Sequence, residues 1–147
     1  MVQLAYKTME QHQNEIIDAC ATLSGDRVAM LDYFIDLGNT LAPIDPLYKT
    51  DAYLVQGCMS KVWLADTYIE ERLFFQADSN TAITKGLISL LLKICSGQSL
   101  QAIVEAKLYF IEAIGISSLI GFQRASGLAH MIKALKVRAL SRLSVSK

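Results

Sequence analysis

Residues 53–64 read YLVQGCMSKVWL and place one cysteine, Cys58, between two runs rich in β-branched and aromatic residues. Such runs predict two β-strands, so Cys58 is expected at the bend between them. Gly57 can adopt backbone conformations closed to other residues and carries no Cβ that would crowd an incoming reagent. A nearby cation such as Lys61, or unpaired N–H groups in the bend, would favour the thiolate. The stretch therefore predicts a reactive thiol in a loop.

The β pattern continues beyond this stretch. Residues 62–69 are expected to leave the loop as a second strand, and residues 73–77 form a third after the polar pair Glu70-Glu71. Helical periodicity predicts two helices before the sheet, over residues 7–21 and 26–38. Three or four should follow it, starting near residues 81, 99, 108 and 124, with residues 115–123 as a connector. Residues 78–80 and Ser99 offer capping side chains. These elements predict an α+β fold with a small three-stranded antiparallel sheet.

Length and charge limit the classes of protein that need to be considered. At 147 residues the chain is expected to form one domain, residues 1–147, with a core that needs no metal or disulfide. A net charge of zero argues against general nucleic-acid binding. No apolar run reaches the roughly 18 to 20 residues of a membrane helix. The first residues do not resemble a secretion signal, so we expect a cytoplasmic protein without a membrane partner.

Basic residues gather near the end of the chain, where no acidic residue follows Glu112. They are Arg124, Lys133, Lys136, Arg138, Arg142 and Lys147. Together with an apolar stripe they form the pattern of a basic amphipathic helix, which can lie on a membrane or dock on an acidic partner. The alternative is an ordinary terminal helix whose cations lie near the favourable end of its dipole. His130 lies off the stripe and is expected at the surface.

Three cysteines, Cys20, Cys58 and Cys95, lie roughly forty residues apart without a CxxC pair. This spacing does not fit a zinc ribbon or a disulfide scaffold and predicts free thiols in a reducing compartment. Cys20 and Cys95 fall on apolar helix faces, where free cysteine usually behaves as a small buried hydrophobe. Cys58 is therefore the candidate for chemistry.

Three stretches resemble the SufE/CsdE family of sulfur acceptors. The first is Gln-Gly-Cys-x-Ser-x-Val-Trp over residues 56–63, and the second is Asp-Ser-x-x-Ala-Ile-x-Lys-Gly-Leu over residues 78–87. The third, over residues 115–128, keeps Arg124, Gly127 and Leu128 but lacks the family's histidine and proline. Asn80 stands where the family often has an acidic residue. The resemblance covers residues 25–138.

This resemblance implies that Cys58 accepts a persulfide sulfur from a cysteine desulfurase of the SufS/CsdA type and passes it toward iron–sulfur cluster assembly. It implies a fold related to the iron–sulfur scaffold fold. It also implies that this chain stimulates the desulfurase. The pyridoxal phosphate would belong to the desulfurase, and this chain would carry no cofactor. The resemblance leaves open whether a downstream cluster scaffold is a second partner. Arg124 and Gly127 are expected at the contact with the partner. Residues expected to support the loop are Gln56, Gly57, Ser60, Lys61, Trp63, Asp78, Ser79 and Lys85.

Other functions remain open beside this one. A non-catalytic adaptor would not need Cys58, a cluster scaffold would need several thiolates close together, and a one-cysteine peroxidase or thioltransferase would act on its own. The favoured interpretation is an accessory to a desulfurase and not a stand-alone enzyme. Trp63 is either a wall of the cysteine pocket or a core side chain. Lys85 either steers the anionic persulfide or is a solvated helix charge.

Overall fold

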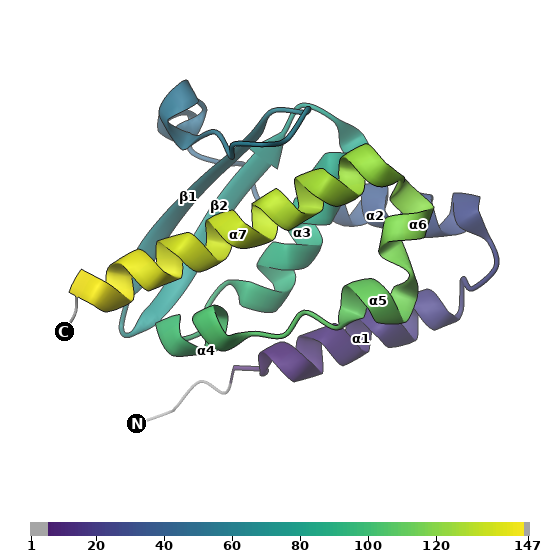
Figure 1. Ribbon diagram of the computed structural model, residues 1–147, viewed down its shortest axis with the longest axis horizontal. Coiled ribbons are helices and arrows are strands. Elements are labelled where there is room, and N and C mark those ends of the chain that lie inside the picture. The colour runs from purple at the N-terminus through teal and green to yellow at the C-terminus, as the bar shows by residue number, and fades with distance from the viewer. Residues whose placement is uncertain (1–5, 146–147) are drawn as a thin grey trace.

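The computed structural model describes residues 6–145 and shows an antiparallel hairpin with α-helices gathered on one of its faces (Figure 1). The hairpin consists of β1 (Val62–Ile69) and β2 (Arg72–Ser79). Before it come α1 (Met9–Ala21), α2 (Arg27–Asn39) and two short 3₁₀ turns, Pro46–Tyr48 and Asp51–Tyr53. The helices that follow it are α3 (Ala82–Cys95), α4 (Leu100–Glu105), α5 (Phe110–Ile114), α6 (Ile116–Ile120) and α7 (Phe122–Val145).

The predicted α+β class is confirmed, but the prediction of three strands is wrong. Residues 53–56 do not form a strand, because the chain leaves a 3₁₀ turn only at Tyr53 and Gly57 turns it again. Leu54 makes an isolated bridge with Trp63, and the Val55 N–H donates to the Val62 carbonyl at 2.8 Å. Too few residues remain for a ladder. Cys58 therefore lies in the loop that leads into β1 and not between the first two strands of a sheet.

The hairpin turn is formed by Glu70 and Glu71, which the sequence predicted as a polar break. Both have positive φ, +51° and +64°, as a two-residue turn between twisted strands requires. The register runs from Ile69 opposite Arg72 to Val62 opposite Ser79. This register places residues 78–80 beside the end of the cysteine loop.

The core lies on one face of the hairpin, where α3 packs against β2 and α2 packs against α3. Helix α3 is buried around most of its circumference, as predicted. The helices α2 and α3 meet at Gly38 and Gly86, where a methyl group on Gly86 would overlap the carbonyl oxygen of Phe34. Such a contact between two backbones is open only to glycine. It fixes the helix that stands behind the cysteine loop.

Helix α7 runs in roughly the same direction as the strands of the hairpin and packs on α3, α4 and α6 (Figure 1). It begins at Phe122, two residues before the predicted start, and residues 115–123 contain α6, so the prediction of a plain connector there is wrong. The left-handed Gly115, with φ of +79°, ends α5 and lets the chain start a new helix at once. Five helical segments therefore follow the hairpin within residues 6–145, where three or four were predicted.

Three of the cations of α7 make contacts within the molecule. Arg138 and Arg142 pair with the carboxylate of Asp66 on β1 at 2.7 and 2.6 Å. The Lys136 ammonium donates to the carbonyls that end α4, those of Val104 at 3.2 Å and Ala106 at 2.6 Å. These contacts favour the interpretation of α7 as an ordinary terminal helix.

Lys147 of the predicted basic group lies outside the described residues. Among the helices that the structure does describe, none is long and apolar enough to cross a membrane.

Candidate functional site

The cysteine loop, residues 56–61, is fastened at both of its ends. The bond from Val55 to Val62 closes its base. On the other side, the Lys61 N–H donates to Oδ1 of Asn80 at 2.9 Å and the Asn80 N–H donates back to the Lys61 carbonyl at 3.2 Å. The prediction that residues 78–80 cap α3 is therefore wrong for Asn80, because its side chain holds the loop. The tip of the loop, Gly57 and Cys58, extends beyond these bonds.

Cys58 is half-buried and points toward α7. Its Sγ donates to the carbonyl oxygen of Gly127 at 3.4 Å, and a Cβ on Gly127 would lie 3.6 Å from the sulfur. Burial raises the pKa of the Cys58 thiol. The expectation that Lys61 would favour the thiolate is wrong for this conformation, because burial is the cause that sets the direction. In this position, which we call the closed loop, Cys58 is a half-buried thiol whose protonated form is favoured by burial.

A cavity of about 210 Å³ lies beside the sulfur. It is formed where the cysteine loop, α3 and the first turns of α7 meet. The residues that line it are Cys58, Met59, Ser60, Thr84, Leu87, Gln123, Arg124, Gly127 and Met131. Residues of all three family-like stretches thus converge on one small cavity.

Hydroxyl groups connect the loop to the start of α3. The Thr81 hydroxyl donates to Oγ of Ser60 at 2.9 Å, and the Thr84 hydroxyl lies 3.3 Å from the same atom. Ser60 therefore joins the loop to the start of α3. The two threonines carry no signal in the sequence, because threonine at the start of a helix is common.

Arg124 and Gly127, expected at the partner contact, take different positions. Arg124 is exposed at the cavity, and its guanidinium donates to the Ile120 carbonyl at 3.4 Å. Gly127 is buried and covered by Cys58 in the closed loop. Of these two residues, only Arg124 is available to a partner in this conformation.

The remaining predicted support residues lie away from the cavity lining. Gln56 and Lys61 are exposed on the loop. Trp63 alternates with the core residues of β1 and so lies on the outer face of the hairpin, where the Lys49 ammonium stands 4.9 Å from its ring centroid. The prediction of Trp63 as a pocket wall is wrong. Nor is it a core side chain, because it is only half-buried.

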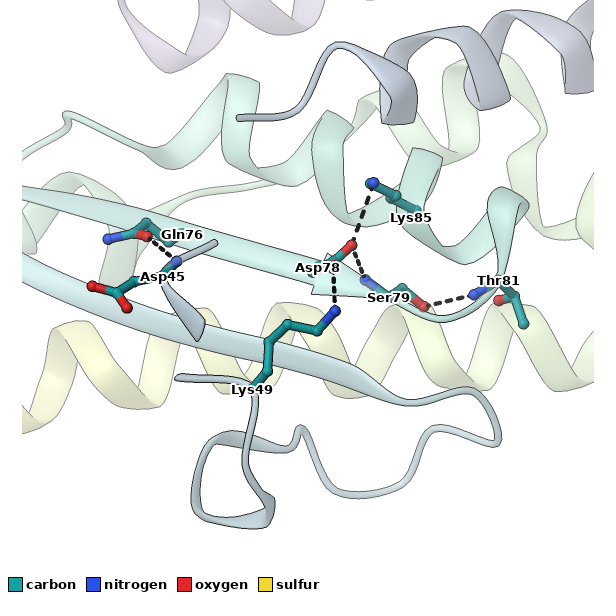
Figure 2. A network of polar contacts seen from close by, with 7 residues as sticks. All are labelled: Asp45, Lys49, Gln76, Asp78, Ser79, Thr81 and Lys85. Atoms are coloured by element: carbon teal, nitrogen blue, oxygen red, sulfur yellow. Dashed lines mark hydrogen bonds and ion pairs between the residues drawn. The ribbon is translucent and has the colours of Figure 1, made fainter. Parts of the chain in front are cut away.

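Asp78 organises the outer face of the hairpin (Figure 2). Lys49 and Lys85 approach its carboxylate from opposite sides, at 3.0 and 3.4 Å, and the Ser79 N–H donates to it at 2.8 Å. Burial raises the pKa of Asp78, but the hydrogen bonds from Lys49 and Ser79 and the charge of Lys85 outweigh it, so that pKa is lowered. Since Lys85 is paired here, the structure gives no support to its role in steering a persulfide.

The same figure shows how the connecting loop before the hairpin is attached. The Asp45 N–H donates to Oε1 of Gln76 at 3.0 Å, and the Thr81 N–H donates to Oγ of Ser79 at 3.4 Å (Figure 2). Thus Asp78 and Ser79 support the end of the hairpin that carries the cysteine loop. They do so through Lys49, Lys85 and the backbone of Thr81, and not by touching the thiol.

The other two cysteines are core residues, as predicted. Cys20 and Cys95 are each 2% exposed. Burial raises the pKa of both thiols, that of Cys95 to about 12. In residues 6–145 no group of three or more His, Cys, Asp and Glu side chains is placed to hold a metal ion. The site is thus a single thiol on a loop that is held at its base and covers a small cavity.

Comparison with known proteins gives the family of this domain. Residues 14–139 match the family described as "SufE: Fe-S metabolism associated domain". The chain therefore belongs to the SufE family. The solution structure of a hypothetical protein from Thermus thermophilus superposes with a TM-score of 0.75 over 90% of this chain and 96% of that one. At 14% identity this likeness shows the shared fold.

Relatives in other organisms agree with this assignment. SufE-like protein 1, chloroplastic/mitochondrial, of Arabidopsis thaliana is 36% identical over 104 residues, 70% of this chain and 28% of the plant protein. An uncharacterized SufE-like protein of Synechocystis is 32% identical, over 71% of this chain and 65% of that protein. One of Rhizobium meliloti is 35% identical, over 76% and 83%. The chain thus spans less than two thirds of the first two relatives.

Proposed function

We propose that this chain is a sulfur acceptor that takes a persulfide sulfur from a cysteine desulfurase onto Cys58 and passes it toward iron–sulfur cluster assembly. The observation that carries the proposal is the position of this thiol. Of the three cysteines in the chain, all within the described residues, Cys58 is the one that is not buried. It lies at the tip of the loop, in a chain of the SufE family.

The reaction needs one nucleophile. The Cys58 thiolate attacks the outer sulfur of a persulfide on the partner, a sulfur–sulfur bond forms to Sγ, and the partner's own sulfur–sulfur bond breaks. The partner's thiolate leaves with the bonding electron pair, so no external oxidant or reductant is required. The proton of the Cys58 thiol passes to solvent or to the leaving thiolate. The product is a persulfide on Cys58.

The closed loop explains how a reactive thiol survives in the free protein. A thiol that is ionised and fully exposed is readily oxidised. In the closed loop, burial keeps Cys58 protonated and its Sγ faces Gly127. Attack on a partner requires the tip to leave this position, after which water or the partner's groups can favour the thiolate. Docking of the desulfurase would then select the open loop.

Arg124 is the residue of α7 that we assign to the contact with the desulfurase, a pyridoxal-phosphate enzyme of the SufS/CsdA type. It is exposed at the cavity and within reach of a partner that approaches Cys58. Arg124→Glu should weaken binding of the desulfurase about tenfold or more, because charge reversal at an interface replaces attraction by repulsion. Isothermal titration calorimetry measures it, and unchanged affinity would remove Arg124 from the interface.

Desulfurase turnover tests the proposed function. A desulfurase is supplied with cysteine, and alanine formation is measured with wild-type protein, Cys58→Ser and Cys20→Ala. Wild type and Cys20→Ala should raise the rate, because each retains an acceptor thiol at the loop, and Cys58→Ser should not. Equal stimulation by Cys58→Ser would favour the non-catalytic adaptor, whose action does not require the thiol.

A further inference from the structure

His130 on α7 lies directly over the glycine that precedes the reactive cysteine. A methyl group on Gly57 would lie 2.5 Å from Cγ and Nδ1 and 2.6 Å from Cδ2 of the His130 ring. A point nearly equidistant from three bonded ring atoms lies over the face of the ring. The imidazole therefore covers the α-carbon of Gly57 with its face, and only a residue without a Cβ fits beneath it.

A second, less tight contact with the loop lies one turn earlier on α7. Gly127 and His130 are three residues apart and so share a face of the helix. Cys58 packs on Gly127, where a methyl group would lie at an ordinary contact distance of 3.6 Å from the sulfur, while His130 covers Gly57. Gly127 and His130, on neighbouring turns of α7, thus both contact the tip of the loop.

The tip has few other attachments among the residues that the structure describes. The bonds from Val55 to Val62 and between Lys61 and Asn80 fasten the base of the loop, and the hydroxyls of Thr81 and Thr84 hold Ser60. The sulfur itself is held by one hydrogen bond of 3.4 Å to the Gly127 carbonyl. This bond is weak, because a thiol is a weak donor. Packing of the His130 ring on Gly57 is therefore a principal restraint on the tip.

We propose that His130 is a positioning residue whose ring holds the Cys58 loop closed on α7 and so sets how often the thiol is presented to a reagent or a partner. The consequence for sulfur transfer rests on the proposed function, while the effect on thiol exposure does not. The role belongs to the shape of the ring and not to its nitrogens. A flat apolar ring of similar size at position 130 should therefore replace the imidazole.

The test is the rate at which iodoacetamide alkylates Cys58 in the free protein, followed by peptide mass spectrometry. His130→Ala removes the cover, His130→Phe keeps a ring, and Val137→Ala is the matched control. Val137 is 49% exposed and lies two turns further along the same helix, about 10 Å from position 130 along its axis. Cys20 and Cys95 serve as internal reporters, because both react only if the core opens.

His130→Ala should raise the Cys58 rate about fivefold, the factor expected when a contact worth roughly 1 kcal/mol is lost. His130→Phe and Val137→Ala should stay within about twofold of wild type, and the two core cysteines should remain unmodified in every variant. An unchanged or lowered rate in His130→Ala would overturn the proposal. So would a rate in His130→Phe equal to that of His130→Ala, because the nitrogens would then be what matters.

A second arm separates this proposal from the proposed function. The same variants are incubated with a desulfurase and cysteine, and sulfur on Cys58 is measured. If His130→Ala alters alkylation but no variant, wild type included, gains sulfur, the positioning role stands and the sulfur-acceptor function fails. If wild type gains sulfur and His130→Ala leaves alkylation unchanged, the function stands and the positioning role fails.

Discussion

Two regions of this molecule use glycine to bring segments close together, and they do so for different ends. In the core, Gly38 and Gly86 let α2 and α3 approach until backbone touches backbone. At the site, Gly57 and Gly127 each receive a side chain, the ring of His130 and the sulfur of Cys58. A contact between two backbones cannot be relieved without moving a helix, whereas a side chain on a glycine can leave by rotation.

The difference teaches where this fold is rigid and where it can open. The contact between α2 and α3 lies in the core, against Phe34, which is fully buried. The contact between the loop and α7 lies at the surface, with Gly57 and His130 exposed. The fold thus holds the base of the loop on a fixed support and leaves the thiol-bearing tip on a contact that can be released. The same residue type has opposite mechanical consequences in the two places.

The largest expected effect is that of Gly86→Ala. Its methyl group would overlap the Phe34 carbonyl, a backbone atom that cannot rotate away, so α2 and α3 must separate. We expect a loss of about 3 kcal/mol in the free energy of unfolding, at the upper end of the range for overpacking. Urea denaturation measures it, with Lys93→Ala on the exposed side of α3 as control. A loss below about 1 kcal/mol, the lower end of that range, would mean that the contact between α2 and α3 is not more rigid than the contact between the loop and α7.

Gly127→Ala should have a smaller effect and the opposite sign. Its methyl group would lie 3.6 Å from the Cys58 sulfur, an ordinary contact distance, and alanine is favoured over glycine inside a helix by about 1 kcal/mol. The variant should therefore be as stable as wild type or more stable by up to about 1 kcal/mol. Thermal and urea unfolding measure it. A destabilised variant would mean that the contact between Cys58 and Gly127 is as rigid as the contact between α2 and α3.

The smallest expected effect concerns pH. Burial raises the pKa of the Cys58 thiol, so the folded state favours the protonated form. Its contribution to stability is present below the pKa of the unfolded chain and is lost as pH rises through the higher pKa of the folded one. The alkylation rate of Cys58 in native protein should therefore level off at a higher pH than in urea-unfolded protein, where cysteine titrates near about 8.5.

Coincident pH profiles in native and urea-unfolded protein would show that the tip is open most of the time. Such a result would also mean that the contact between the loop and α7 does not shelter the thiol in the free protein.

Features with a local pattern in the sequence were easier to predict than the elements around them. Cys58 could be found because a glycine-flanked cysteine between apolar runs is a local pattern, and Cys20 and Cys95 could be assigned to the core because helical periodicity is local too. The first strand was predicted wrongly because residues 53–56 have β-type side chains but too little length between two turns. Helix α6 was missed because five residues between glycines carry no periodic signal.

Contacts that join distant segments could not be predicted from the chain. Asn80 was expected to cap a helix, yet its side chain binds the backbone of Lys61 across the hairpin end. His130 was correctly placed at the surface, but its contact with Gly57 joins residues more than seventy positions apart. Trp63 was tied to the cysteine by its nearness in sequence, although alternation along β1 turns it to the outer face.

The central claim is that Cys58 accepts sulfur, and intact-protein mass spectrometry tests it most directly. Wild type and Cys58→Ser are each incubated with a cysteine desulfurase and cysteine, with and without a final treatment with reductant. The account predicts a gain of one sulfur, about 32 Da, on wild type alone, and its removal by the reductant, as for any sulfur–sulfur bond. An equal gain on Cys58→Ser, or no gain on wild type with any of several desulfurases, would contradict it.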